Sequence, residues 1–537
     1  MRTLVTWCCP LLLAASTACG DPEDDGPRSA IASGLPRPFE DIYVDWGAAR
    51  REARFRALMG FPMRDEAALD RYIELTYDPE HPDFRQYMAV RVWMDRHAPL
   101  ESGLGEVQAW LTGGGMAVER VGANRLLLEF SGTVGQFNDA FQTELRDFDR
   151  ENPSAGRPPL HVYGSLTPLT APPSIAERVT GVVTVDLPAD SDALPGEAGE
   201  IVMQPPTDVA QGMTLSQIAH AYGLAELYAL GFRGQGVKLG LVTGATFKFN
   251  DLQSFWRSLG ITRNDPIGVQ TMEPIATRYL ETTLDTQWSG GLAPEAEVIA
   301  YQGPDSRNTS IVYTFNEAIA RAEVSVLSSS FAHREETEAP VIHAHYNASA
   351  KMGAALGITI VVASGDSARP DVPSSSPYVT CVGGTQLRLL PSGEVDSEVA
   401  WAGSGSGPSR VFEMPAWQKG VVTDSEGKRA VSDVALNASP ESSYWVYYLA
   451  NWERYGGTSF AAPVFAATVA VVNSYRVANG APVAGFLNPA LYQSSAVQAA
   501  FRDIVQGETA FHAAKAGWDY PTGWGAPRAA ELAVALP

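Results

Sequence analysis

The second half of the chain alternates short apolar runs with stretches of helical length, and this alternation restricts the fold more than any other feature. An apolar run that is followed by a helix and then by another apolar run predicts a mainly parallel sheet with helices on both faces. The expected strands are 237–242, 298–301, 324–329 and 359–363, and the expected helices are 251–259, 310–321 and 348–356. In such a sheet the active site lies at the carboxyl ends of the strands. Residues that directly follow a strand are therefore the first candidates for chemistry.

A hydroxyl group is placed at the start of an apolar helix in this half. Gly456 and Gly457 lead into Thr458 and Ser459, and an alanine-rich run over 460–472 follows. Glycines allow a tight turn and a close approach of substrate, and a helix start offers unpaired N–H groups to a developing negative charge. The same residues also suit a plain turn with a helix N-cap. The stretch alone does not choose between these readings.

Three acidic residues stand where an α/β active site would be built. On a helix, Glu281 and Asp285 share one face at i and i+4, and such close like charges raise the pKa of at least one carboxyl. Asp366 follows the apolar run 359–363 through a Ser-Gly turn, which places it at the carboxyl edge of the sheet. The alternatives are a solvated acidic helix face for the first two residues and an Asx-turn or helix cap for Asp366. Ser329 and Ser330 also follow a strand and either line a substrate cleft or simply end that strand.

A metal site is suggested near the C-terminus. Asp503 and Asp519 lie close to glycine-containing loops. Two carboxylates with loop carbonyls are the ligands that a hard cation such as Ca²⁺ prefers, although the spacing is not that of an EF-hand.

A histidine base is not indicated by the sequence. A serine nucleophile usually pairs with histidine, yet none of the five histidines of the second half lies in a His-Gly-Thr setting, and no G-x-S-x-G elbow surrounds Ser459. These histidines are His220, His333, His343, His345 and His512. If Ser459 is a nucleophile, its base is therefore a carboxylate.

The first half of the chain has a different pattern and no recognisable chemistry. Over 39–186 the sequence predicts a smaller α+β domain with helices at 65–77, 104–113 and 134–141, and two strands within 118–130. Residues 187–208 are rich in Pro, Gly, Ala and acidic side chains and read as an exposed linker. A chain of 537 residues is long enough for two domains. The order of a domain, a linker and a catalytic-looking domain (209–537) fits either a propeptide or a plain two-domain protein.

The N-terminal residues indicate export, and the net charge argues against nucleic acid as a partner. Arg2 precedes a short apolar run over 4–15, too short to span a bilayer, so residues 1–18 read as a signal peptide. Residues 16–20 resemble a bacterial lipobox around Cys19, except that Ser16 stands where Leu is usual, and 19–38 would then form a polar tether. Ordinary secretion is the alternative. The formal net charge of −22 argues against nucleic-acid binding.

The cysteines exclude an internal disulfide in the exported chain. Cys8 and Cys9 leave with the signal, Cys19 is at the cleavage point, and only Cys381 remains in the body. Cys381 lies in an apolar run and is expected to be a small buried side chain.

Together these elements resemble the sedolisin family of serine-carboxyl peptidases over nearly the whole chain. The Ser-Gly-Thr-Ser-x-x-x-Pro motif is matched at 456–463, Glu-x-x-Leu-Asp at 281–285, Ala-Ser-Gly-Asp-Ser-Gly at 363–368, and the calcium elements at 503–504 and 517–523. Gly456 replaces a Ser, Ala368 replaces a Gly, and Tyr520 is inserted before Pro521. None of these three departures removes a catalytic group, and the insertion is expected to loosen the turn after the metal loop.

The resemblance implies a fold, a mechanism and partners. It implies a subtilisin-like catalytic domain behind an inhibitory prodomain, a monomer that acts on peptide or protein substrates, and an acidic pH optimum. In the implied mechanism Ser459 is the nucleophile, Glu281 its base, Asp285 the partner that sets the proton affinity of Glu281, and protonated Asp366 the oxyanion donor. One structural Ca²⁺ would be held by the carboxylates of Asp503 and Asp519 and by the carbonyls of Ile504, Lys515 and Gly517.

Two other functions remain open at this point. One is a subtilisin-type Ser-His-Asp peptidase on a related sheet, which the missing histidine motif disfavours. The other is a surface-anchored binding protein that kept the fold and lost catalysis, which the presence of Glu281, Asp285, Asp366 and Ser459 disfavours. The cleavage specificity, endopeptidase or tripeptidyl-peptidase, is not indicated.

Overall fold

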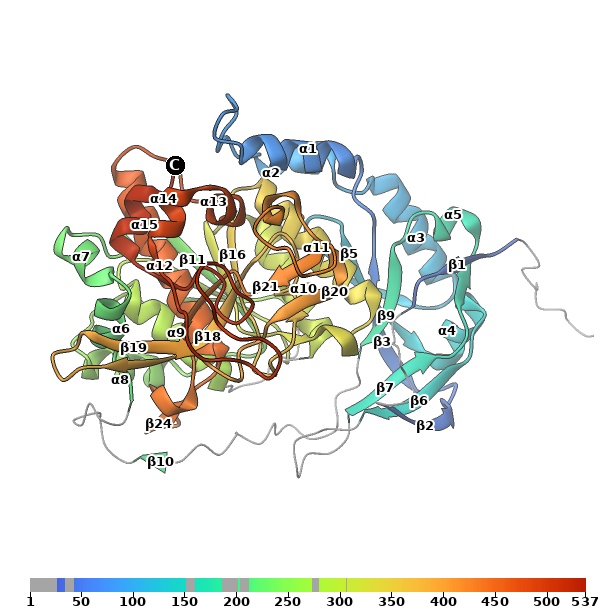
Figure 1. Ribbon diagram of the computed structural model, residues 1–537. Coiled ribbons are helices and arrows are strands. Elements are labelled where there is room, and N and C mark those ends of the chain that lie inside the picture. Colours follow the sequence, from blue (N-terminus) through green and yellow to red (C-terminus); the bar gives the residue numbers. More distant parts are fainter. Residues whose placement is uncertain are drawn as a thin grey trace, which may run out of the picture.

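The computed structural model describes residues 27–33, 43–150, 160–185, 201–202, 212–272, 280–305 and 307–537. A large α/β body is joined side by side to a smaller body formed by the first part of the chain (Figure 1). The expected signal peptide, Cys8, Cys9 and Cys19 lie outside the described residues, as do most of the expected tether and linker.

The large body is built on one sheet whose central strands are all parallel, as the sequence predicted. Neighbouring strands run in the order β12-β13-β11-β14-β16-β18-β19, with β22 also paired to β18. Only the β18–β19 pair is antiparallel. The strands are β11 (Lys238–Thr243), β12 (Ile267–Gln270), β13 (Glu297–Gln302), β14 (Val326–Ser329), β16 (Thr359–Ala363), β18 (Thr380–Leu389), β19 (Val395–Ala400) and β22 (Val434–Asn437). Cys381 lies in β18 and is fully buried, which confirms its expected role.

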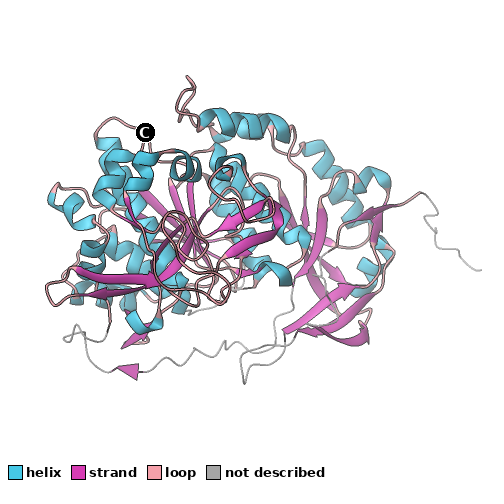
Figure 2. Cartoon of the chain, in the orientation of Figure 1, coloured by secondary structure: helices cyan, strands magenta, loops and turns pink. Residues whose placement is uncertain are grey.

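Helices cover both faces of this sheet (Figure 2). On one face α12 (Thr458–Ala478) crosses β14, β16 and β18 and packs against α9 (Leu280–Leu292), which is itself covered by α8 (Phe249–Ser258). On the other face α10 (Asn308–Arg321) and α11 (Pro340–Ala355) pack together over β11, β13 and β16. Helix α12 is apolar on all sides because it is buried on all sides. It is long and apolar enough to cross a membrane, but about 89% of that stretch lies inside the protein, as expected for a core helix.

The smaller body is a mixed α+β domain whose two larger sheets are both antiparallel. One sheet has the order β4-β5-β3-β9 and the other β2-β6-β7. The strands are β2 (Tyr43–Ala48), β3 (Arg54–Gly60), β4 (Ala117–Val121), β5 (Leu127–Thr133), β6 (Leu145–Arg150), β7 (Leu160–Ser165) and β9 (Gly181–Val185), and the helices are α1 (Glu66–Thr76), α2 (Val90–Arg96), α3 (Glu101–Gly113), α4 (Val134–Phe141) and α5 (Pro173–Ala176). A cluster of aromatic rings that includes Phe55, Phe130, Phe137 and Phe141 fills its core. Within the span expected to be a tether, β1 (Ser29–Ile31) pairs with β8 (Leu169–Ala171) of this domain.

The remaining elements connect and complete the large body. Strand β10 (Ile201–Val202), from the expected linker, pairs with β24 (Asn451–Tyr455), which also pairs with β23 (Tyr444–Tyr448). The others are β15 (His333–Arg334), β17 (Asp371–Val372), β20 (Gly407–Glu413), β21 (Lys428–Val431), β25 (Phe501–Arg502), β26 (Ala526–Pro527), α6 (Leu215–Ala221), α7 (Leu224–Ala229), α13 (Asn488–Gln493), α14 (Ser495–Ala499), α15 (Ala529–Ala535) and the short 3₁₀ turns η1 (Glu335–Thr337), η2 (Ala416–Gln418) and η3 (Pro440–Ser442).

The two bodies meet where β9 and the β4–β5 turn of the small domain contact α10 and α11. The side-chain amides of Asn124 and Asn316 donate to one another, at 2.8 and 3.1 Å, and the Ala123 N–H donates to the Glu317 carboxylate. Both asparagines are fully buried. Because buried amides left unpaired would cost free energy, this reciprocal pair holds the two bodies in one register.

Candidate active site

The start of α12 is shaped by two glycines. Gly457 has φ +134°, and a Cβ built on it would lie 2.8 Å from the Oδ2 atom of Asp366. A Cβ on Gly456 would lie 2.4 Å from the backbone nitrogen of Pro440. Any side chain at either position would displace a neighbour. Gly457 therefore lets the Asp366 carboxyl lie directly against the backbone that precedes Ser459, and Gly456 lets Pro440 pack against the same backbone.

Asp366 is held by the first residue of that helix. The Thr458 N–H and the Thr458 hydroxyl both donate to Oδ1 of Asp366, each at 2.8 Å. The same hydroxyl accepts from the Gly365 N–H at 3.1 Å. Asp366 is exposed at the surface, but the protein atoms packed around its carboxyl desolvate it and raise its pKa above the usual value. The two hydrogen bonds from Thr458 oppose that rise. Because Oδ1 already accepts two hydrogen bonds, Oδ2 is the oxygen that would carry a proton.

Asp285 lies on α9 and contacts the residue that follows β14. The Ser330 hydroxyl oxygen is 2.6 Å from Oδ1 of Asp285 and 3.1 Å from the carbonyl oxygen of Ser459. Burial, and then the neighbouring Glu281 carboxylate, raise the pKa of Asp285 well above its usual range, while the Ser330 hydrogen bond lowers it. Glu281 lies one helical turn before Asp285 and is partly buried.

Aromatic packing fixes α9 relative to the start of α12. The ring of Phe460 stacks on Tyr444 with centroids 4.5 Å apart, and Trp288 of α9 meets Tyr444 edge-on at 4.6 Å. The Trp288 indole N–H donates to the Trp445 carbonyl. All three rings are fully buried, so the helix that carries Glu281 and Asp285 cannot shift against the helix that carries Ser459 without breaking this cluster.

The structure therefore joins Asp285 to the Ser459 backbone through the Ser330 hydroxyl, and joins Asp366 to Thr458, the residue next to Ser459. The sequence indicated the three acids and Ser459, but it did not reveal the donor role of Thr458. Ser330 was noted only as the residue after a strand. Its separation of 45 residues from Asp285 left no local signal for their contact.

The histidines of the large body lie in other environments. His345 packs against Gly60 at the contact between the two bodies, His343 meets the ring of Phe412, and His512 stacks on Tyr520. His220 is in the last turn of α6 and His333 in β15.

The expected metal ligands lie together on the C-terminal loop, apart from the acids described above. The Gly517 N–H donates to Oδ2 of Asp503 at 2.9 Å, and the Lys515 N–H donates to Oδ2 of Asp519 at 2.8 Å. Mainly through burial, with a contribution from the Asp503 carboxylate, the pKa of Asp519 is raised to about 6. Within the described ranges no group of three or more His, Cys, Asp or Glu side chains is arranged to hold a metal ion. A site here would use two carboxylates and backbone carbonyls, and the proximity of these two acids fits a cation between them.

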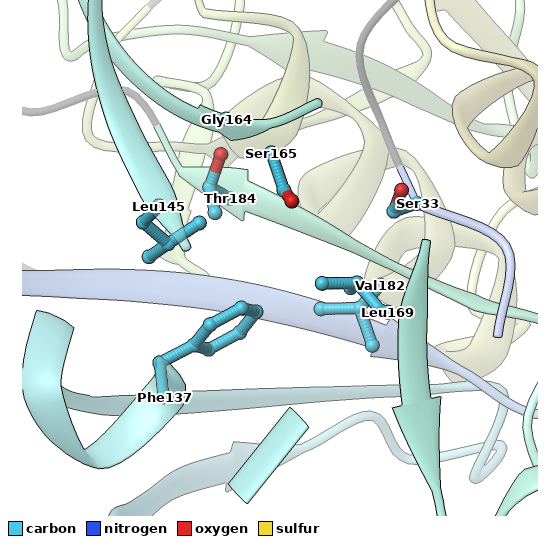
Figure 3. A pocket seen from close by; sticks show the side chains of 8 residues that line it. All are labelled: Ser33, Phe137, Leu145, Gly164, Ser165, Leu169, Val182 and Thr184. Atoms are coloured by element: carbon cyan, nitrogen blue, oxygen red, sulfur yellow. The ribbon is translucent and has the colours of Figure 1, made fainter. Parts of the chain in front are cut away.

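A pocket in the small domain offers no chemistry. It lies between α4 and strands β7, β8 and β9 (Figure 3). The residues that line it are apolar or hydroxyl-bearing, and none is titratable: Ser33, Phe137, Leu145, Gly164, Ser165, Leu169, Val182 and Thr184.

Comparison with known proteins gives the same order of domains. Residues 44–187 match the family described as Pro-kumamolisin, activation domain, and residues 274–525 match the subtilase family. Kumamolisin of Bacillus sp. (strain MN-32) is 29% identical over 494 residues, which cover 85% of this chain and 87% of that protein. Sedolisin of Pseudomonas sp. (strain 101) is 26% identical, in an alignment that covers 89% of this chain and 86% of that protein. Tripeptidyl-peptidase 1 of Homo sapiens is 24% identical, with 90% and 92% covered.

A solved structure supports the fold of the large body. The structure of Pseudomonas sedolisin, a serine-carboxyl proteinase complexed with two molecules of pseudo-iodotyrostatin, aligns with a TM-score of 0.55 and 24% identity. The alignment covers 61% of this chain and 98% of that one.

Proposed function

Because the chain belongs to the sedolisin family of serine-carboxyl peptidases and carries a pro-kumamolisin-type activation domain, we propose that it is a proenzyme that hydrolyses peptide bonds through an acyl-enzyme on Ser459. The observation that carries this assignment is the convergence of Asp366 and buried Asp285 on one helix start. Asp366 is bonded to Thr458, and Asp285 is joined through Ser330 to the Ser459 backbone.

Glu281 acts as the general base in this proposal. The Ser459 hydroxyl oxygen forms a bond to the peptide carbonyl carbon while its proton passes to the Glu281 carboxylate. The same proton is then given to the leaving amine as the peptide C–N bond breaks. Asp285 holds a proton because burial and the Glu281 charge raise its pKa. A neutral Asp285 beside an ionised Glu281 avoids two buried like charges and leaves one carboxylate to accept the proton.

Asp366 stabilises the oxyanion while it is protonated. Its Oδ1 atom is occupied by Thr458, so the proton on Oδ2 is the one that can be donated to the tetrahedral intermediate. The sign of the pH dependence follows. Above the raised pKa of Asp366 the proton is lost and so is the donor, so activity falls as pH rises. At the acid end activity falls when Glu281 becomes protonated. The pH profile should therefore be bell-shaped with an acidic optimum.

The small domain acts as an intramolecular inhibitor of the proenzyme, as its activation-domain family indicates. We place its boundaries at 39–186 and the activation cleavage within 187–208. Its contacts with α10 and α11 include buried Lys351, whose ammonium forms ion pairs with Glu66 and Asp70 of the small domain. Removal of this domain therefore means breaking polar contacts as well as a packed surface.

One Ca²⁺ ion would strengthen the C-terminal loop. Its ligands in this proposal are Asp503, Ile504, Lys515, Gly517 and Asp519, through two carboxylates and three carbonyls. The loop is bonded to the rest of the site: the Ser404 hydroxyl donates to the Pro521 carbonyl, and the Gly405 N–H donates to the carbonyl of Gly365, next to Asp366. The ion would thus stabilise the loop behind Asp366 without taking part in the reaction.

Export places the enzyme outside the cytoplasm, where it acts as a monomer. A lipid anchor on Cys19 would hold it at the cell envelope. A Cys19→Ala variant tests the anchor. It should move the protein from the membrane fraction to the soluble exported fraction, and an unchanged distribution would refute lipidation.

The assignment is tested by acid incubation of the full chain. At pH 3–5 the protein should cleave itself within 187–208, as shown by N-terminal sequencing, and should then hydrolyse a peptide library. The Ser459→Ala variant should do neither. An activity maximum near pH 8 that is lost when one of the histidines is replaced would contradict the proposal.

A further inference from the structure

Ser330 occupies the space between the general-base helix and the nucleophile helix. It directly follows β14, at the carboxyl end of a central strand, and is partly buried. Its hydroxyl oxygen is within hydrogen-bond distance of both Asp285 Oδ1 (2.6 Å) and the Ser459 carbonyl oxygen (3.1 Å).

The Ser459 carbonyl needs such a donor because of Pro463. In an α-helix the carbonyl of residue 459 accepts from the N–H of residue 463, but residue 463 of α12 is proline and has no N–H. The Ser330 hydroxyl donates to this carbonyl instead. The nucleophile therefore sits in a helical turn that is completed by a side chain from another strand.

A single hydroxyl hydrogen cannot serve both oxygens, so the state of Asp285 decides where it points. When Asp285 is protonated, its own O–H can donate to the Ser330 oxygen, and Ser330 donates to the Ser459 carbonyl. When Asp285 is ionised, the carboxylate attracts the Ser330 hydrogen, since hydrogen bonds to charged acceptors are stronger. The Ser459 carbonyl then loses its donor.

We propose that Ser330 is a positioning residue that couples the proton on Asp285 to the placement of the Ser459 turn. This inference rests on the proposed function, because it assigns Asp285 and Ser459 their roles in the peptidase reaction. It adds a second connection between base and nucleophile besides the proton transfer to Glu281. The helix turn is held for attack only while Asp285 carries its proton.

A merely structural role for Ser330 makes a different prediction. If the hydroxyl only completed the helix, an N–H at residue 463 would replace it fully. Pro463→Ala supplies that N–H without touching the acids. Comparison of S330A, P463A and S330A/P463A therefore separates helix completion from coupling.

The test measures kcat, KM and the pH profile of kcat for the activated enzyme and these variants, with S330T as the conservative control. S330A should lose kcat by about tenfold or more at an unchanged KM. Because the Ser330 hydrogen bond favours the ionised form of the Glu281–Asp285 pair, its loss should move the acid limb to higher pH by about one unit. S330T keeps a hydroxyl and should retain most of the activity.

The double variant gives the decisive result. S330A/P463A should recover the melting temperature of the parent and much of its kcat, because the N–H of residue 463 now holds the turn, but it should keep the shifted acid limb. Full recovery of kcat and of the profile, or a single S330A variant that behaves like the parent, would overturn the inference. If S330A does not fold, the double variant carries the same test, because it restores the helix bond. Retained activity in Ser459→Ala would instead refute the proposed function itself.

Discussion

Acid should release the small domain partly through His345, a histidine that takes no part in the proposed chemistry. His345 lies on α11, and a Cβ placed on Gly60 of β3 would come within 1.9 Å of its ring. The imidazole therefore rests directly on the backbone of the small domain, beside Thr180. Burial lowers the pKa of His345 from 6.5 to about 4. Once the small domain leaves, this ring faces solvent and should titrate near its ordinary value.

The magnitude follows from the linkage between docking and proton binding. The docked state has the depressed pKa, so it holds fewer protons than the free state between pH 6.5 and 4. The contribution of neutral His345 to docking is fully present above pH 6.5, is lost as pH falls, and stops changing below about pH 4. With a free-state pKa of about 6.5, the dissociation constant should rise about 100-fold between pH 7 and pH 4, or about 3 kcal/mol.

The ion pairs of Lys351 cross the same contact and need their own control. The Lys351 ammonium pairs with Glu66 and Asp70 of the small domain. A Lys351→Met variant removes these ion pairs and leaves His345 in place. The contributions of the two residues to docking can therefore be measured separately.

The assay uses the Ser459→Ala full chain with a specific protease site inserted within 187–208. After cleavage at neutral pH, the dissociation constant of the small domain is measured between pH 7 and pH 4. In a His345→Gln variant the rise should be about 100-fold smaller than in the parent, while in Lys351→Met most of it should persist. An equally steep rise in the His345→Gln variant would refute this account of His345.

Three further predictions concern the site itself. Asp366→Ala removes the proposed oxyanion donor and should lower kcat about 10²- to 10³-fold with little change in KM, measured on the activated enzyme at its optimum; a loss confined to KM would contradict the role. Gly457→Ala should abolish most activity, because the new Cβ would lie 2.8 Å from Asp366. Gly480 has φ +81° but open space around it, so Gly480→Ala should lower only the stability. An equal loss of activity in the two variants would contradict the role of close approach at Gly457. EDTA should lower the melting temperature of the activated domain, and Asp503→Asn should lower it without a chelator. An unchanged melting temperature in both experiments would refute the Ca²⁺ site.

The sheet of the large body was predictable because its central strands are buried on both faces. Such strands are continuous apolar runs, so 237–242, 298–301 and 359–363 were found within one or two residues of β11, β13 and β16. Helix α11 begins at Pro340, eight residues before the expected start at 348. The stretch 340–347 mixes apolar side chains with His343 and His345, so no polar face marks the start of the helix, and both histidines are buried in the structure.

The short antiparallel strands were not predicted for a related reason. Strands β19, β20 and β24 carry polar or charged side chains and are partly exposed, so they show neither an apolar run nor strict alternation. Only their pairing partners define them as strands. Tertiary context, rather than local sequence, sets this part of the fold.

In the site too, positions set by local spacing were predictable and contacts between distant elements were not. Glu281 and Asp285 could be placed on one helix face from their spacing alone, and Asp366 could be placed at a strand end. The contact between Ser330 and Asp285 joins two elements 45 residues apart, and the two hydrogen bonds from Thr458 reach Asp366 across 92 residues. Neither the helical nor the strand periodicity of the sequence indicates such contacts. They depend on how the strands are ordered in the sheet.

The central claim is that Ser459 carries the acyl group and that acids replace histidine. It is tested most directly by quenching the activated enzyme in acid during turnover of a peptide ester near pH 4, and then mapping the covalent adduct by mass spectrometry. The account predicts an acyl group on the peptide that contains Ser459, and no adduct in Ser459→Ala. An adduct on another residue, or turnover that persists in Ser459→Ala, would contradict it.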